Sequence, residues 1–145
     1  MIELDEALQA AVGAAFDRGY PFVLGTVDAE GQPHLAHYGT VQALDGQRLG
    51  LWTRRPEGLV GRITANPRVA LSHWDPQARL LLRFEGRAHV ATDEATRTAI
   101  FEGSPTVERE RDPDRTGVAV VVELTRVRGV ANGQRFEMQA DPPPA

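Results

Sequence analysis

One strand end, rich in hydroxyl and guanidinium groups, is the part of the sequence best suited to chemistry. Thr53, Arg54 and Arg55 follow an apolar run and directly precede Pro56, which suits the first turn of a helix. Arginine binds phosphate with two hydrogen bonds, threonine can donate a third, and the amides at a helix N-terminus favour negative charge. The pattern predicts an anion-binding site. The alternative is that Arg54 and Arg55 are solvated loop residues.

Two aromatic residues fall on the predicted strands around this segment. Tyr38 and Trp52 could line a slot that accepts an aromatic ring. Taken singly, each is also explained by ordinary barrel packing or by a dimer contact.

The four histidines do not form a predicted metal site. His34 and His37 are three residues apart on a predicted strand, where alternate side chains point to opposite faces. His73 and His89 lie on neighbouring predicted strands but several residues out of register. The sequence also contains no nucleophile elbow, phosphate-binding loop or dinucleotide fingerprint, so a hydrolase triad, a nucleotide hydrolase and a doubly wound dinucleotide fold are not expected.

Composition excludes several classes of function. The 145 residues fit a single domain, and a net charge of -4 does not favour nucleic acid or an anionic membrane surface. There is no cysteine, which rules out disulfides, thiolate catalysis and iron-sulfur clusters. The acidic N-terminus is unlike a signal peptide, and no apolar run approaches the roughly 20 residues that span a bilayer. We therefore expect a cytoplasmic protein that binds neither nucleic acid nor membrane.

The first half of the chain is predicted to place the anion site at the end of a strand. Apolar spacing predicts a helix over about residues 4–16, with Gly19 as a stop signal. Three strands joined by turns at Gly31 and at Asp45-Gly46 are expected to form an antiparallel meander; they cover residues 22–28, 33–43 and 48–54. A helix from Pro56 to Asn66 follows.

The second half is predicted to complete a small barrel. Strands are expected over 68–75, 79–91 with a bulge at Gly86, 118–130 and 134–138. Thr92 is predicted to cap a helix that runs to Phe101, and a short charged helix ends near Asp112. Residues 1–140 should form a single mainly β domain of six or seven antiparallel strands with short helices, because barrel closure removes exposed strand edges. Residues 141–145 are predicted to be a disordered tail.

Four segments, in their order and spacing, resemble successive signatures of the pyridoxamine 5'-phosphate oxidase-like family. They span about residues 20 to 90 and are Phe22–His34, Leu49–Thr53, Ala65–Leu71 and Phe84–Ala88. The resemblance implies a split β-barrel homodimer that holds FMN in a groove between subunits.

The resemblance also implies a set of cofactor-binding residues. The second strand would lie beside the flavin and its phosphate, and the third strand with the following loop would hold the ring edge and phosphate. The family commonly has basic residues where this chain has Glu57-Gly58-Leu59, so Arg54, Arg55 or Arg62 would have to substitute. The predicted set is His37, Tyr38, Gly39, Thr40, Trp52, Thr53, Arg54, Arg55, Leu59 and Arg62.

The function implied is that of an FMN-dependent oxidoreductase acting on a small substrate. The flavin carries the redox chemistry, so no protein nucleophile is required. One alternative is a deazaflavin-dependent reductase of the same superfamily. Another is a non-catalytic flavin- or haem-binding protein, with His37 or His73 as a haem ligand.

Overall fold

The computed structural model describes residues 1–142 and contains four helices and eight strands. The helices are α1 (Glu6–Gly13), α2 (Glu57–Ala65), α3 (Glu94–Gly103) and α4 (Thr106–Glu110). The strands are β1 (Phe22–Val27), β2 (Pro33–Tyr38), β3 (Gln42–Ala43), β4 (Arg48–Thr53), β5 (Arg68–Asp75), β6 (Leu80–Val90), β7 (Val118–Ala131) and β8 (Gln134–Gln139).

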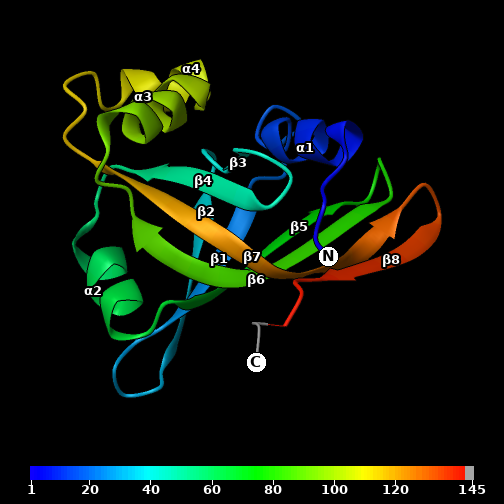
Figure 1. The fold of residues 1–145 in the computed structure, drawn as a ribbon. Helices are drawn as coiled ribbons and strands as arrows, with labels where there is room; N and C mark the ends of the chain where they lie inside the picture. Colours follow the sequence, from blue (N-terminus) through cyan, green and yellow to red (C-terminus); the bar gives the residue numbers. More distant parts are fainter. Residues whose placement is uncertain (143–145) are drawn as a thin grey trace.

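All the strand pairs are antiparallel and belong to one sheet in the order β2-β1-β5-β6-β7-β4-β3, with β8 paired to β7. The long strands β6 and β7 cross the middle of the molecule, and the sheet curls around them (Figure 1). Among the described residues no pairing joins the end strands β2 and β3, so the barrel is split rather than closed. The mainly β split barrel expected from the sequence is confirmed, with the two-residue β3 raising the strand count to eight.

The prediction of one long strand over 33–43 and a three-stranded meander is wrong. The chain breaks between Tyr38 and Gln42, so that β2 pairs with β1 whereas β3 pairs with β4. Beyond these hairpins, β1 pairs with β5 and β4 pairs with β7. The two hairpins therefore lie at opposite ends of the sheet order, with the break at Gly39 joining them.

Several local predictions are confirmed. Gly31 turns the first hairpin with a φ of +86°, and the register of β6 against β7 shifts at Gly86, where a bulge was predicted. Other boundaries differ: α1 ends at Gly13 and continues as turns to Gly19, and Asp93 rather than Thr92 caps α3 by accepting the Thr96 amide.

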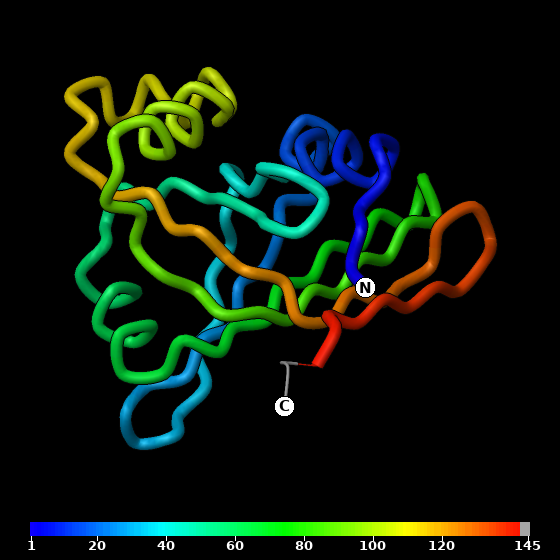
Figure 2. Tube along the Cα trace, viewed as in Figure 1, coloured from blue at the N-terminus to red at the C-terminus, as the bar shows by residue number. Residues whose placement is uncertain are grey.

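Strands β4 and β7 are buried on both faces because two apolar cores lie on either side of them. Val120 and Val122 of β7 belong to the main core inside the curled sheet. Ala119 and Val121 point the other way, into a smaller core with Ile100 and other residues of α3. The position of α3 and α4 over this outer face is visible in Figure 2. For this reason β7 contains consecutive buried residues instead of alternating buried and exposed ones.

The two ends of the described chain meet. The Met1 amine lies 3.2 Å from a carboxylate oxygen of Asp141. The rest of the predicted tail, residues 143–145, lies outside the described residues. Within residues 1–142, each helix is too short or too polar to cross a bilayer.

Candidate functional site

A pocket of about 360 Å³ opens where β2 and β4 end, beside α4. Four segments far apart in sequence meet there. The lining residues are Phe16, Pro21, Ala36, His37, Tyr38, Gly39, Thr40, Trp52, Thr53, Arg54, Arg55, Glu108 and Arg111.

Thr40 holds part of the pocket lining in place. Its buried hydroxyl accepts the Trp52 amide at 3.0 Å and donates to the Trp52 carbonyl at 2.8 Å. One side chain thus makes both hydrogen bonds that a neighbouring strand would give to β4 at this point. The end of β4 is held in place although the strand opposite it has broken.

The indole of Trp52 lies in the smaller core beneath α3. The residue is 3% exposed, its ring meets Phe101 edge-on at 5.0 Å, and the Arg97 guanidinium lies 4.8 Å from its centroid. Its Nε1 donates to Asp112 at 2.9 Å. Only part of Trp52 therefore faces the pocket, and packing accounts for most of its contacts.

Asp112 anchors the loop between α4 and β7. Burial opposes ionisation of its carboxylate, but hydrogen bonds from the Thr116 and Gly117 amides and from Trp52 outweigh that effect and lower its pKa to about 2. The carboxylate is charged at neutral pH and is stabilised by N–H and O–H donors.

The mouth of the pocket carries three guanidinium groups. Arg54 and Arg55 are exposed on the loop after β4, and Arg111 follows α4. Glu108 lies between two of them, 3.9 Å from Arg54 Nε and 3.2 Å from an Arg111 nitrogen. With Thr53 beside them, these groups give this end of the pocket more positive than negative charge, an arrangement suited to an anion.

The N-terminal segment forms another part of the pocket wall. A side chain at Gly39 would lie 2.5 Å from the Phe16 ring, so glycine is needed for this ring to approach β2. Phe16 and Pro21 belong to the turns between α1 and β1, which have little regular structure of their own. Contacts with another part of the chain must therefore hold Phe16 and Pro21 in place.

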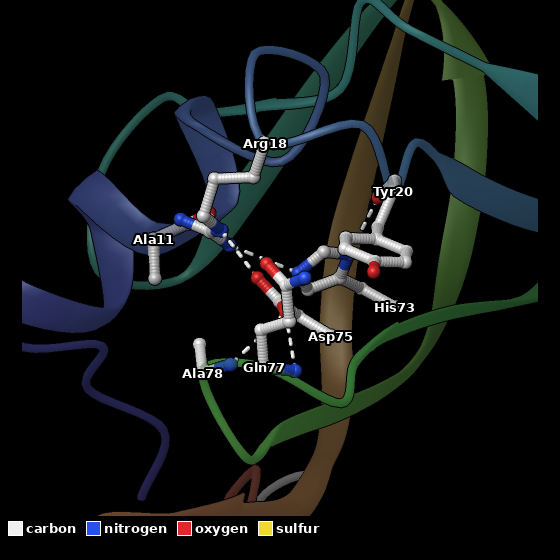
Figure 3. Close-up of polar contacts among 7 residues, drawn as sticks. All are labelled: Ala11, Arg18, Tyr20, His73, Asp75, Gln77 and Ala78. Carbon is white, nitrogen blue, oxygen red and sulfur yellow. Dashed lines mark hydrogen bonds and ion pairs between the residues drawn. The ribbon is translucent and has the colours of Figure 1, made fainter.

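A buried polar cluster fixes this segment to β5 (Figure 3). Arg18 reaches from the turn to Asp75, with Nε 2.9 Å from Oδ2, and to His73 Nε2 at 2.9 Å. His73 Nδ1 lies 2.7 Å from the Tyr20 carbonyl oxygen. Because a carbonyl only accepts and a guanidinium only donates, Nδ1 carries the proton and Nε2 accepts.

This cluster keeps His73 neutral. Burial, together with the Arg18 charge, lowers the pKa of His73, although the Tyr20 carbonyl and Asp75 act in the opposite direction. With 1% exposure and both ring nitrogens occupied, His73 cannot bind a metal or haem iron without breaking the cluster.

Eight of the ten residues predicted for the site line the pocket. The other two lie on α2 and do not: Leu59 is 2% exposed in the main core, and Arg62 donates from Nε to the Thr26 hydroxyl at 2.7 Å. Helical spacing turns both residues toward the sheet.

Sequence reasoning missed five lining residues. Phe16, Pro21 and Ala36 have no pattern that marks them, whereas Glu108 and Arg111 lie on and after a helix recognised only as charged. Within residues 1–142 no cluster of three or more histidine and acidic residues could hold a metal ion.

Known structures share this fold. The HupZ protein of Group A Streptococcus aligns with a TM-score of 0.65 and 17% identity, covering 92% of this chain and 98% of its own. A Clostridium acetobutylicum protein related to general stress protein 26, of the pyridoxinephosphate oxidase family, aligns with a TM-score of 0.67 and 15% identity. The alignment covers 94% of this chain and 96% of that protein. A haem-binding protein from Mycobacterium smegmatis aligns with a TM-score of 0.61 and 20% identity. The alignment covers 90% of this chain but 57% of that protein.

Sequence comparison identifies the family directly. No curated protein sequence matches significantly. The sequence model described as pyridoxamine 5'-phosphate oxidase matches residues 8–130, which include β1 to β6, all but the last residue of β7, and the whole pocket. The chain belongs to the pyridoxamine 5'-phosphate oxidase family.

Proposed function

We propose that the pocket at the ends of β2 and β4 binds FMN and that the protein is an FMN-dependent oxidoreductase acting on a small substrate. The observation that carries this proposal is the arrangement of Arg54, Arg55 and Arg111 beside Thr53, at the mouth of a pocket that also contains Tyr38. Guanidinium and hydroxyl groups suit a phosphate, and an aromatic side chain suits a flat ring.

The size and lining of the pocket fit such a group. Its volume of about 360 Å³ lies within the range of small-ligand sites, roughly 300–1,000 Å³. Thr53 and the arginines would hold the phosphate, and Tyr38 would lie beside the ring. A bound flavin would supply the electron or hydride transfer, while this chain would provide orientation and shielding from water.

A second copy of the chain would enclose the pocket. Leu35 and Trp74 are 78% and 53% exposed, and both point outward from the curled sheet. A shallow groove of about 330 Å³ runs beside Leu35 on this face. His37 lies on the same face of β2 as Leu35, and it also lines the pocket. A homodimer formed through this face would therefore bring the partner subunit to the pocket mouth.

Titration with FMN tests the proposal. We expect saturable quenching of FMN fluorescence by the wild-type protein, and about tenfold weaker binding by an Arg54→Gln/Arg55→Gln double variant, since charged hydrogen bonds to phosphate are lost. Arg79→Gln, at an exposed arginine in the turn between β5 and β6, is the control and should bind as the wild type does.

The deazaflavin coenzyme is titrated in parallel because its acidic tail would use the same arginines. Tighter binding of the deazaflavin than of FMN would assign the protein to that branch. Absence of binding by either cofactor would refute a flavin site.

Haem binding is the second candidate, and the exposure of His37 at the pocket favours it. His37 is free of the contacts that occupy His73, and a structure with this fold belongs to a haem-binding protein. A Soret band that shifts in His37→Ala, but not in His34→Ala on the opposite face of β2, would support this function. No uptake of haem would exclude it.

A further inference from the structure

Glu108 is the one acidic residue among those lining the pocket. It lies in the middle of α4, and its side chain is only 14% exposed. One carboxylate oxygen lies 3.2 Å from an Arg111 nitrogen and the other 3.9 Å from Arg54 Nε. The carboxylate thus lies between two of the three guanidinium groups at the pocket mouth.

Those two arginines come from segments that are distant in the sequence. Arg54 follows β4 and Arg111 follows α4, so their positive charges would repel each other if no anion lay between them. Glu108 supplies that anion from within the chain. A phosphate group and a carboxylate accept the same kind of hydrogen bond from a guanidinium, so both compete for these donors.

We propose that Glu108 is an intramolecular competitor for the anion-binding end of the pocket and sets how strongly the pocket prefers phosphate-bearing ligands over neutral ones. This inference rests on the proposed function, because it concerns the same pocket. A phosphate that binds Arg54 and Arg111 competes with Glu108 for their N–H donors and is repelled by its charge. A neutral ligand of the same shape leaves that ion pair undisturbed.

The test compares FMN with riboflavin, which has the same ring but no phosphate. Glu108→Gln keeps the length of the side chain and removes its charge. We expect FMN to bind Glu108→Gln about three- to tenfold more tightly than wild type, as partly exposed ion pairs contribute modestly. Riboflavin affinity should change less than about twofold, and the gain for FMN should shrink at high salt.

Glu110→Gln is the matched control. It removes the same charge two residues further along α4, from an exposed side chain that does not line the pocket. Its FMN affinity should equal that of wild type. Circular dichroism melting of both variants checks that α4 remains folded.

The outcomes separate this inference from the proposed function. If wild type binds FMN and Glu108→Gln binds it equally or more weakly, Glu108 is no competitor, while the FMN site stands. If no variant binds any flavin, the FMN site fails, and calorimetry with pyrophosphate decides the inference. Tighter pyrophosphate binding by Glu108→Gln would then support it, and equal or absent binding would overturn it.

Discussion

The imidazole of His73 lies between a carbonyl oxygen and a guanidinium, so a second proton on the ring would bring two positive charges together. Burial and Arg18 lower its pKa below the ordinary value of 6.5. The unfolded chain therefore takes up this proton more readily than the folded protein does. The stability that His73 contributes is complete above pH 6.5 and declines as the pH falls below that value toward the folded-state pKa.

We predict that His73→Phe lowers the free energy of unfolding by about 2 kcal/mol at neutral pH, because Arg18 and the Tyr20 carbonyl lose their hydrogen-bond partner. The phenyl ring would keep the stacking on Phe22, whose centroid is 5.1 Å away. Urea unfolding at about pH 7.5 and about pH 5.5 measures both effects, and the variant should lose much of the wild type's dependence on pH between these values.

His89→Phe is the control for this experiment, since His89 is exposed on β6. It should retain the pH dependence of wild type. An unchanged pH dependence in His73→Phe would show that the buried cluster does not sense protonation.

At the scale of elements, the break between β2 and β3 depends on Thr40. Its hydroxyl accepts a hydrogen bond from the Trp52 amide and donates one to the Trp52 carbonyl, as the backbone of a neighbouring strand would. Thr40→Val has the same shape but leaves these two buried groups without partners. We expect a loss of about 2 kcal/mol in urea unfolding, and weaker FMN binding because the end of β4 carries the arginine loop.

Thr98→Val, at a partly exposed position on α3, provides the comparison, because its hydroxyl contacts only Glu94 at 3.4 Å. Its unfolding midpoint should stay near that of wild type. A Thr40→Val midpoint as high as that of Thr98→Val would mean that β4 is held by its pairing with β7 alone.

At the scale of the whole molecule, the outward face around Leu35 and Trp74 decides whether the protein works as a pair. An aspartate at position 35 would place charge in an apolar interface, where desolvation is costly. We predict that wild type is a dimer by light scattering, that Leu35→Asp is monomeric, and that the variant binds FMN more weakly despite a native circular dichroism spectrum.

Ala95→Asp adds the same charge at an exposed position on α3, away from that face, and should remain dimeric. A monomeric wild-type protein would refute the homodimer. A monomeric Leu35→Asp variant that binds FMN normally would show that one copy completes the site.

Local order is readable from the sequence because neighbouring residues determine it. The turn at Gly31, the bulge at Gly86 and the extent of α2 follow from the backbone preferences of glycine and proline. The location of Thr53 and the two following arginines at a strand end follows from the same rules. Together with the family resemblance, this predicted most of the pocket lining and the split barrel.

Only the tertiary structure decided which distant segments meet. The edges of β4 offer the same amide and carbonyl groups to any strand, so its pairing with β7 on one edge and β3 on the other is set by the packing of the two cores. The same packing brings Glu108 and Arg111 to the pocket and turns Leu59 away from it. These arrangements depend on contacts between residues more than fifty positions apart, and no local pattern of apolar or charged residues encodes them.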